Sequence, residues 1–191
     1  MKKIMILLSV VALSGTMFAQ NQVSRGWFLI EANTGNSTGV VSTMISSTNF
    51  GFTKQDNSTR FSYGLDGGYC IMDNLALKAG LGYYSSKINF SDSSVFKYSA
   101  ISYRLGAKYY VMSKIPVTLD VTGQSGQSEW DGVSTEEDEL PMWLGIGAGY
   151  AFFLGDNVSI EPGLRYNMNL NSAIEDLPAV IQFNVGFALH F

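Results

Sequence analysis

Apolar and polar residues alternate with a period of two along most of the chain. In residues 181–191 every odd position is apolar and every even position is polar or small. This period is the signature of a β-strand with two different faces. The same alternation, weakest in the first segment because Trp27 and Leu29 are both apolar, predicts strands over 26–33, 59–71, 75–85, 97–111, 116–125, 140–153, 158–170 and 181–191.

The connections between these segments alternate in length. Polar loops are predicted over 34–58, 86–96, 126–139 and 171–177, and short turns over 72–74, 112–115 and 154–157. Within the first loop, Val40–Ile45 either extends a strand or forms a small extra hairpin, and the pattern does not decide between the two. Short turns on one side and long loops on the other are typical of membrane barrels, whose even strand number places both termini in the periplasm.

Composition decides which solvent the apolar face meets. Charged residues make up 15% of the chain, well below the roughly 25% of soluble domains. An uncovered apolar strand face would promote aggregation in water, whereas lipid requires such a face. No later segment is long enough for a membrane helix, so the only spanning form is a closed barrel. We therefore predict an all-β fold, an eight-stranded antiparallel up-and-down transmembrane β-barrel whose Tyr and Phe residues form two interfacial girdles.

The N-terminal residues have the pattern of an export signal. Lys2 and Lys3 precede a short apolar run, Ile4–Leu13, and small residues lead to Ala19. The apolar run is too short to span a bilayer of about 30 Å. We expect a signal peptide over 1–19, cleaved before Gln20, and a barrel domain over 20–191. Cys70 is the only cysteine, so no internal disulfide is expected.

Charged residues within the predicted strands fall on the face that points away from lipid. They are four acids and four bases: Glu31, Asp66, Asp120, Glu161, Lys78, Arg104, Lys108 and Arg165. A barrel of eight strands is just wide enough for side chains to fill it, and buried charges need partners. We predict an ion-paired, plugged interior, with Gly145, Gly147 and Gly149 leaving room for Arg104 and Trp27. A proton path, a gated pore and a buried ligand site remain alternatives for the same charges.

Three parts of the sequence carry a resemblance to a known family. They are the signal segment Lys2–Ala19, the block 64–69 followed by 73–83, and the terminal strand ending in Phe191. In these the chain resembles the small eight-stranded bacterial outer-membrane barrels, the OmpA- and OmpX-like proteins, without the periplasmic domain that some of them append. The resemblance implies the bacterial outer membrane as the location.

The resemblance also implies how the chain is assembled and what it contacts. The terminal strand is similar to the signal read by the barrel-assembly machinery, carried here by Phe183, Val185, Phe187, Leu189 and Phe191. Expected partners are outer-membrane lipid, the assembly machinery with periplasmic chaperones, and an extracellular partner at the loops. The main hypothesis is a role in envelope structure or surface interaction. A small pore for ions or tiny solutes is the alternative, and a lipid-modifying enzyme of the outer leaflet is a third hypothesis.

Candidate chemistry is sparse. The only histidine, His190, lies at the periplasmic end, whereas the lipid-modifying barrels of the family use a histidine near the outer leaflet, so we expect no enzyme. The acidic run Glu136–Glu139 with Asp131 is interpreted as a solvated loop rather than a Ca²⁺ site. We expect no cofactor or metal. The net charge of −4 gives no basic stripe for a nucleic-acid partner.

Overall fold

A computed structural model describes residues 23–33, 48–91, 94–136, 142–171 and 179–191. The predicted signal peptide over 1–19 and the segment Val40–Ile45 lie outside these residues. The strands are β1 (Phe28–Asn33), β2 (Asn49–Gln55), β3 (Ser58–Met72), β4 (Leu75–Ser91), β5 (Ser94–Val111), β6 (Ile115–Trp130), β7 (Val133–Glu136), β8 (Met142–Gly149), β9 (Phe152–Phe153), β10 (Val158–Asn169) and β11 (Val180–His190). No helix in the described residues is long and apolar enough to cross a membrane.

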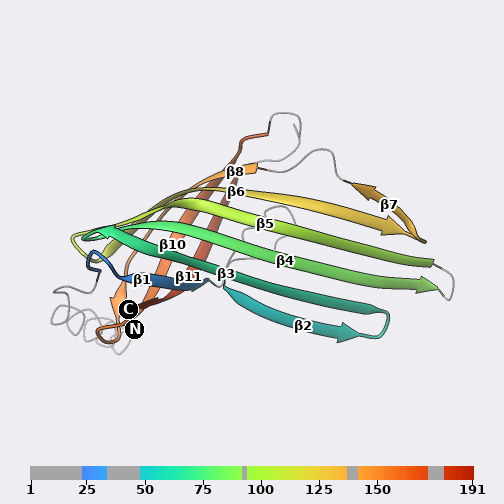
Figure 1. The fold of residues 1–191 in the computed structure, drawn as a ribbon, viewed down its shortest axis with the longest axis horizontal. Coiled ribbons are helices and arrows are strands. Elements are labelled where there is room, and N and C mark those ends of the chain that lie inside the picture. Colours follow the sequence, from blue (N-terminus) through green and yellow to red (C-terminus); the bar gives the residue numbers. More distant parts are fainter. Residues whose placement is uncertain (1–22, 34–47, 92–93, 137–141, 172–178) are drawn as a thin grey trace, which may run out of the picture.

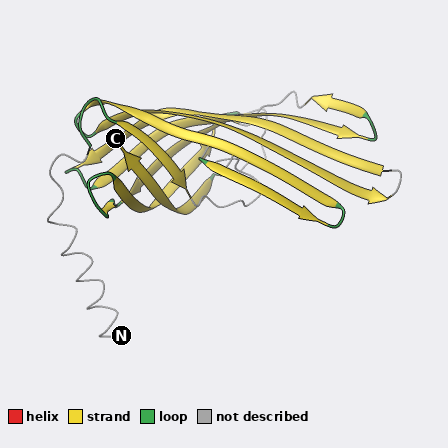
Figure 2. Cartoon of the chain, turned by 60° about the horizontal axis from the view of Figure 1, so that its bottom comes forward, coloured by secondary structure: helices red, strands yellow, loops and turns green. Residues whose placement is uncertain are grey.

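The strands form one closed antiparallel barrel of eight positions around the wall, so the predicted fold is confirmed (Figures 1 and 2). The strands pair in the order β1-β11-β10-β8-β6-β5-β4-β3-β2, with β7 on β6 and β9 on β10, and a further pairing of β1 with β3 closes the wall. Leu29 lies opposite His190 and Asn33 opposite Gly186 in the closing pair. β10 pairs with the other edge of β11 as far as Leu189, so the last strand has both edges paired over 186–189.

Two positions around the wall are each shared by two short strands. β1 and β2 both pair with β3, β1 over Gly67–Tyr69 and β2 over Ser58–Gly64. At their junction the Thr48 hydroxyl accepts a hydrogen bond from the Asp66 amide at 2.8 Å and donates one to the Asp66 carbonyl at 3.1 Å. A side chain thus replaces one backbone partner where the strand position passes from β1 to β2.

The predicted strand over 140–153 is interrupted, since β8 ends at Gly149 and β9 comprises only Phe152–Phe153. The register is the same on both sides of the break, with Gly149 opposite Gly163 and Phe152 opposite Ile160. Pro162 lies opposite the break. Its carbonyl accepts the Tyr150 amide at 3.0 Å, but proline has no N–H to return the bond, so the ladder loses one rung.

The predicted loops over 34–58, 86–96 and 126–139 are wrong for much of their length. β2 occupies 49–55, β4 and β5 run to Ser91 and from Ser94, and β6 with β7 forms a hairpin around Asp131-Gly132. We call the projecting part of this sheet the outer extension: residues 51–55, 58–62, 84–91, 94–100, 126–130 and all of β7. It projects beyond the barrel with β2 and β7 at its two sides (Figure 1).

The alternation does not predict the part of the outer extension on β4 to β7 because there it has the opposite sense. In the barrel the outward positions are apolar, whereas beyond it Ile88, Phe96 and Trp130 take the lumen-side face. β5 has 18 residues, and a tilted membrane strand needs only about 9–11. Outside the bilayer no lipid selects an apolar outer face, so the aromatic rings pack together instead, with Trp130 5.4 Å from Phe90 and 5.7 Å from Phe96 between ring centroids.

Candidate functional site in the barrel lumen

The barrel lumen contains all eight of the charged residues that alternation places on the inner face. Seven of them are buried, and Arg165 is half-buried. Their inward direction follows from strand parity, because outward neighbours such as Leu65, Leu77 and Leu105 are more than half exposed. The lumen is therefore polar while the outer wall is apolar.

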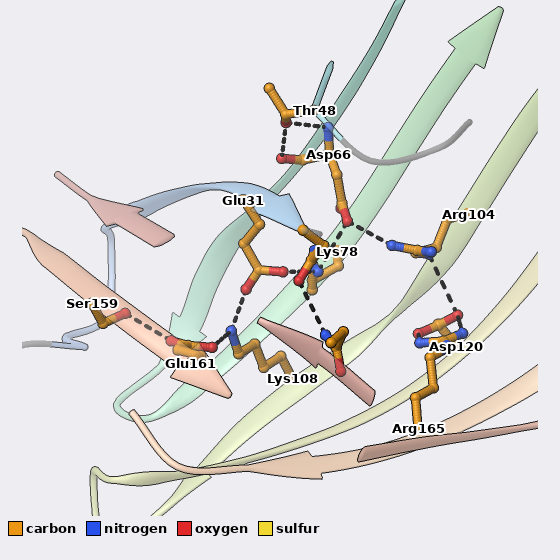
Figure 3. A network of polar contacts seen from close by, with 12 residues as sticks. Glu31, Thr48, Asp66, Lys78, Arg104, Lys108, Asp120, Ser159, Glu161 and Arg165 are labelled. Atoms are coloured by element: carbon orange, nitrogen blue, oxygen red, sulfur yellow. Dashed lines mark hydrogen bonds and ion pairs between the residues drawn. The ribbon is translucent and has the colours of Figure 1, made fainter. Parts of the chain in front are cut away.

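The part of the charge network nearer the short turns connects four strands. Lys78 on β4 contacts Glu31 on β1, and Lys108 on β5 contacts both Glu31 and Glu161 (Figure 3). Glu161 also accepts hydrogen bonds from the Tyr110 hydroxyl at 3.0 Å and from the Ser159 hydroxyl at 2.8 Å. Each carboxylate thus has more than one donor, which is what offsets the cost of burying its charge.

The part of the network farther from the short turns is built around two aspartates. Arg104 Nη1 lies 2.8 Å from Asp66 Oδ2, and Arg165 Nη1 lies 2.6 Å from Asp120 Oδ2. Arg165 makes a second contact with the other oxygen of Asp120, so this pair is bidentate. Lys78 joins the two parts, since its Nζ is 3.2 Å from Asp66 Oδ2. Arg104 Nε lies 3.6 Å from Asp120 Oδ1, so the eight residues form one connected chain of ion pairs across the lumen.

Strand register explains how long side chains fit into so narrow a barrel. On at least one neighbouring strand, each of the eight charged residues lies opposite a small residue, Gly, Ala or Thr. Lys78 lies between Gly68 and Gly106, and Asp120 between Gly106 and Gly145. Small residues leave the cross-lumen space that a lysine or arginine needs.

One expectation about this space is wrong. Gly145 makes room for Arg165, not for Arg104: a Cβ at Gly145 would overlap the Arg165 guanidinium. Trp27 packs instead against a cluster of buried apolar residues at the end of the barrel beside the short turns. The alternation showed which residues point inward, but not which strand each glycine faces.

Gly106 offers a direct test of this packing. A Cβ there would overlap Asp120 and lie 2.7 Å from its Cα, so Gly106→Val must displace β6 and the carboxylate that Arg165 binds. We expect the free energy of unfolding to fall by about 1–3 kcal/mol, as for other overpacked cores, measured by urea titration in detergent micelles. The matched control is Ala107→Val on the lipid-facing side of the same strand, which should not destabilise the barrel. Equal losses would show that the inner face is not tightly packed.

The end of the lumen beside the short turns contains an apolar cluster. It consists of Val23, Leu29, Cys70, Ala76, Tyr110, Ala151, Phe153 and Ala188, with Trp27 packed against it. His190 is 1% exposed, and its ring lies 5.7 Å from that of Phe153 and 5.9 Å from that of Tyr110. Its Nε2 is 3.2 Å from the Ser159 hydroxyl. Ser159 has no exposed surface, so its contact with His190 serves packing and polar satisfaction rather than attack on a substrate.

A small cavity of about 80 Å³ remains beside the network. On one side it is bordered by the charged residues, and on the side of β1 and β11 by Asn33, Gln182 and Asn184. Gln182 accepts a hydrogen bond from the Asn167 amide at 2.9 Å. A space of this size and polarity suits a few water molecules. Sequence reasoning did not identify these amides, although the even positions of Gln182 and Asn184 on the last strand mark those two as inward.

The remaining predicted residues have simple places in the structure. Phe183, Phe187, Leu189 and Phe191 are 47% to 64% exposed on the outer wall, and Val185 is half-buried there. Asp131 forms the tight hairpin turn before Gly132, with φ of 48° and 88° respectively, an Asp-Gly pair that already signals a hairpin in the sequence. Glu136 ends β7, and 137–139 lie outside the described residues. Within the described residues no cluster of His, Cys, Asp or Glu is placed to hold a metal ion.

Comparison with known proteins agrees with this architecture. The family model of the outer membrane protein beta-barrel domain matches residues 6–191. The chain therefore belongs to this family and is a β-barrel protein of the bacterial outer membrane. The resemblance seen in the sequence is confirmed. No curated protein sequence matches the chain.

Several solved structures share the fold. The N-terminal barrel of OprF from Pseudomonas aeruginosa is 15% identical with a TM-score of 0.43, and the match covers 87% of this chain and 98% of that one. The attachment invasion locus protein Ail of Yersinia pestis is 13% identical with a TM-score of 0.48, covering 87% and 99% of the two chains. Neisserial surface protein A is 15% identical with a TM-score of 0.39, covering 87% and 97%.

Proposed function

We propose that the protein is a sealed outer-membrane barrel that acts, without enzymatic activity, in envelope structure or surface interaction through its extracellular part. The single observation that carries this proposal is the connected chain of ion pairs across the lumen, above an apolar cluster that fills the periplasmic end. An ion crossing the lumen would have to separate buried charge pairs or enter apolar packing, and both are costly.

The part that remains to act is the outer extension. Long strands project from one end of the barrel, while tight turns join the strands at the other end. Long connections of outer-membrane barrels lie outside the cell, so the extension meets the cell exterior. This replaces the predicted polar loops by an ordered sheet as the expected contact surface for an extracellular partner. Export through the signal peptide and recognition of the terminal strand by the assembly machinery complete the proposal.

The test of the sealed lumen is single-channel recording in planar bilayers. The wild-type protein should give no unitary currents, and stable unitary currents would support the small-pore alternative, which the polar cavity beside the network favours. Lys108→Ser combined with Glu161→Ser removes one cation and one anion, so the lumen keeps its net charge while losing two long side chains. We expect this variant to conduct.

A matched control makes the same chemical change outside the lumen. Lys97 and Glu129 form an exposed pair on β5 and β6, 2.7 Å apart, and replacing both by serine should leave the protein silent. If the lumen variant is also silent while unboiled gel mobility shows that it is folded, the apolar cluster rather than the ion-pair chain seals the barrel.

A further inference from the structure

The inward face of the outer extension, which continues the lumen side of the barrel wall, carries an apolar row beside the hairpin turns. In register across β2 to β7 this row consists of Gln55, Ser58, Ile88, Phe96, Trp130 and Val133. The ring of Phe90 stacks on that of Trp130, with 5.4 Å between centroids and 27° between planes. We call the five apolar residues, Ile88, Phe90, Phe96, Trp130 and Val133, the apolar platform.

The apolar platform is exposed although it lies beyond the bilayer. Phe90 is 59% exposed, Trp130 51% and Val133 69%. Lipid cannot account for this exposure, because the platform faces the lumen side of the sheet and not the surrounding membrane. Apolar surface in contact with water is unfavourable, and a contiguous exposed patch of it is typical of a binding site. The platform therefore needs a partner that covers it.

A polar row adjoins the platform on the same face, two residues nearer the barrel on each strand. It consists of Thr53, Arg60, Ser86, Tyr98, Ser128 and Thr135. All of these except Arg60 carry a hydroxyl group, so we call this the hydroxyl row. A hydrogen bond of 2.7 Å from Gln124 Nε2 fixes the Tyr98 hydroxyl. Two residues along a strand span about 6.6–6.8 Å, so one ligand can contact both rows.

The two faces of the extension differ in charge. Among the strand residues of the extension that the structure describes, Arg60 is the one charged residue on the inward face. Charged residues on the outward face include Lys54, Lys87, Lys97 and Glu129. Asp131, in the turn beside Trp130, already accepts a hydrogen bond from the Val95 amide at 2.7 Å. An ionic ligand would find its partners on the outward face, so the inward face favours an uncharged one.

We propose that the inward face of the outer extension binds an uncharged glycan, with a sugar ring stacked on Trp130 and its hydroxyl groups hydrogen-bonded to the hydroxyl row. A pyranose ring has an apolar face of C–H groups, which packs against an aromatic ring, and a rim of hydroxyl groups, which needs polar partners at its side. The apolar platform and the hydroxyl row provide these two surfaces next to each other.

The hydroxyl row favours a glycan over an apolar peptide. A peptide with apolar side chains would cover the platform, but it would also cover neighbouring hydroxyl groups without pairing them, which is costly. The apolar residues Ile88, Phe96, Trp130 and Val133 extend over four neighbouring strands, a width of roughly 14 Å at about 4.8 Å per strand. This surface is wide enough for more than one sugar unit. The proposal names the class of partner for the surface interaction proposed above and rests on the extracellular location of the extension.

The test measures binding of uncharged tetrasaccharides to the folded protein in phosphatidylcholine nanodiscs. The probes are cellotetraose, maltotetraose, mannotetraose and xylotetraose; saturation-transfer NMR detects the bound sugar, and titration gives its Kd. We expect at least one of them to bind. Trp130→Ala should weaken this binding about tenfold through loss of the stacked ring. Ser128→Ala should weaken it about fivefold, the effect of one lost hydrogen bond.

The matched controls make the same changes on the outward face. Phe90→Ala should weaken binding, whereas Phe52→Ala removes an outward ring of similar exposure, 63% against 59%, and should bind as wild type. Ser99→Ala is the counterpart of Ser128→Ala, since both side chains are half-buried but face opposite sides of the sheet. Trp130→Phe keeps an aromatic ring and should retain most of the binding. Unboiled gel mobility verifies that each variant is folded.

Absence of binding by all of the tetrasaccharides would overturn the proposal, as would unchanged binding by Trp130→Ala or an equal loss in Phe52→Ala. Binding of dextran sulfate that exceeds that of dextran and survives Trp130→Ala would identify a charged ligand on the outward face instead. Tighter binding of a peptide of alternating leucine and serine, lost in Trp130→Ala but not in Ser128→Ala, would assign the platform to a peptide. Nanodiscs leave both sides of the membrane open to solution, so these results do not depend on the orientation of the barrel, and channel recording tests the sealed lumen separately.

Discussion

Replacing Lys108 by methionine should lower the free energy of unfolding by about 3–5 kcal/mol, because it leaves buried carboxylates without their shared cation. Lys108 is 2% exposed and contacts both Glu31 and Glu161. Its Nζ also lies 4.8 Å from the centre of the Tyr110 ring. Methionine retains much of the side-chain volume, so the loss reports charge rather than a cavity. Urea unfolding of the reconstituted protein, followed by tryptophan fluorescence, measures the effect.

The same strand offers the control for this variant. Lys97 is also on β5 and also paired with a glutamate, but its side chain is 50% exposed. Lys97→Met should change the free energy of unfolding by about 0–1 kcal/mol, as for other surface ion pairs. Adding Glu161→Gln to Lys108→Met should recover part of the loss, since Glu161 is the carboxylate left without a lysine partner and is then neutral, whereas Glu31 keeps Lys78. A loss no larger than that of Lys97→Met would show that the lumen is hydrated enough to screen its charges.

Replacing Leu105 by arginine should lower the free energy of unfolding by about 2–4 kcal/mol, the cost of a cation on the lipid face near the bilayer centre. Leu105 is 62% exposed in the isolated chain and lies between Ala79 and Val121 on the outer wall. The measurement is urea unfolding from lipid vesicles. The cost arises because lipid cannot solvate the guanidinium.

Ser99→Arg is the control for Leu105→Arg. Ser99 is on the same face of the same strand but in the outer extension, opposite Ser85 and Gln127. A cation there meets headgroups and water, so stability should change little. Equal costs at the two positions would place the membrane higher on the barrel than the aromatic residues indicate, and no cost at Leu105 would show that this wall does not face lipid.

Much of the wall could be predicted from the sequence, and the errors in the loops predicted over 86–96 and 126–139 have one cause. Within the bilayer, lipid selects apolar residues at every outward position, so alternation identified β3, β5 and β11 nearly to their ends. Beyond the bilayer this selection stops. Ile88, Phe96 and Trp130 then occupy the inward positions. The alternation therefore predicts a loop where the strand continues. The Asp131-Gly132 turn is a signal that could have corrected one of these loops.

The same division applies to the lumen. The odd or even position of a residue in its strand decides whether its side chain points inward, and the register between strands decides which inward side chains meet. Parity alone places Asp66, Lys78 and Arg104 on the inner face, because a strand can direct a side chain to only two sides. It does not say that Lys78 bridges Glu31 and Asp66, nor that Arg165 rather than Arg104 fills the space beside Gly145. Those pairings depend on how far each strand is shifted against the next around the barrel.

The sequence by itself determined the class of fold, the membrane that it suits and the two faces of the wall. These follow from a period of two and from the preference of lipid for apolar groups, both of which are local properties of each strand. The tertiary structure alone decided which charges pair in the lumen and which strands meet in the outer extension. These relations depend on several strand registers and turns together. Closure of the barrel fixes all of these registers at once.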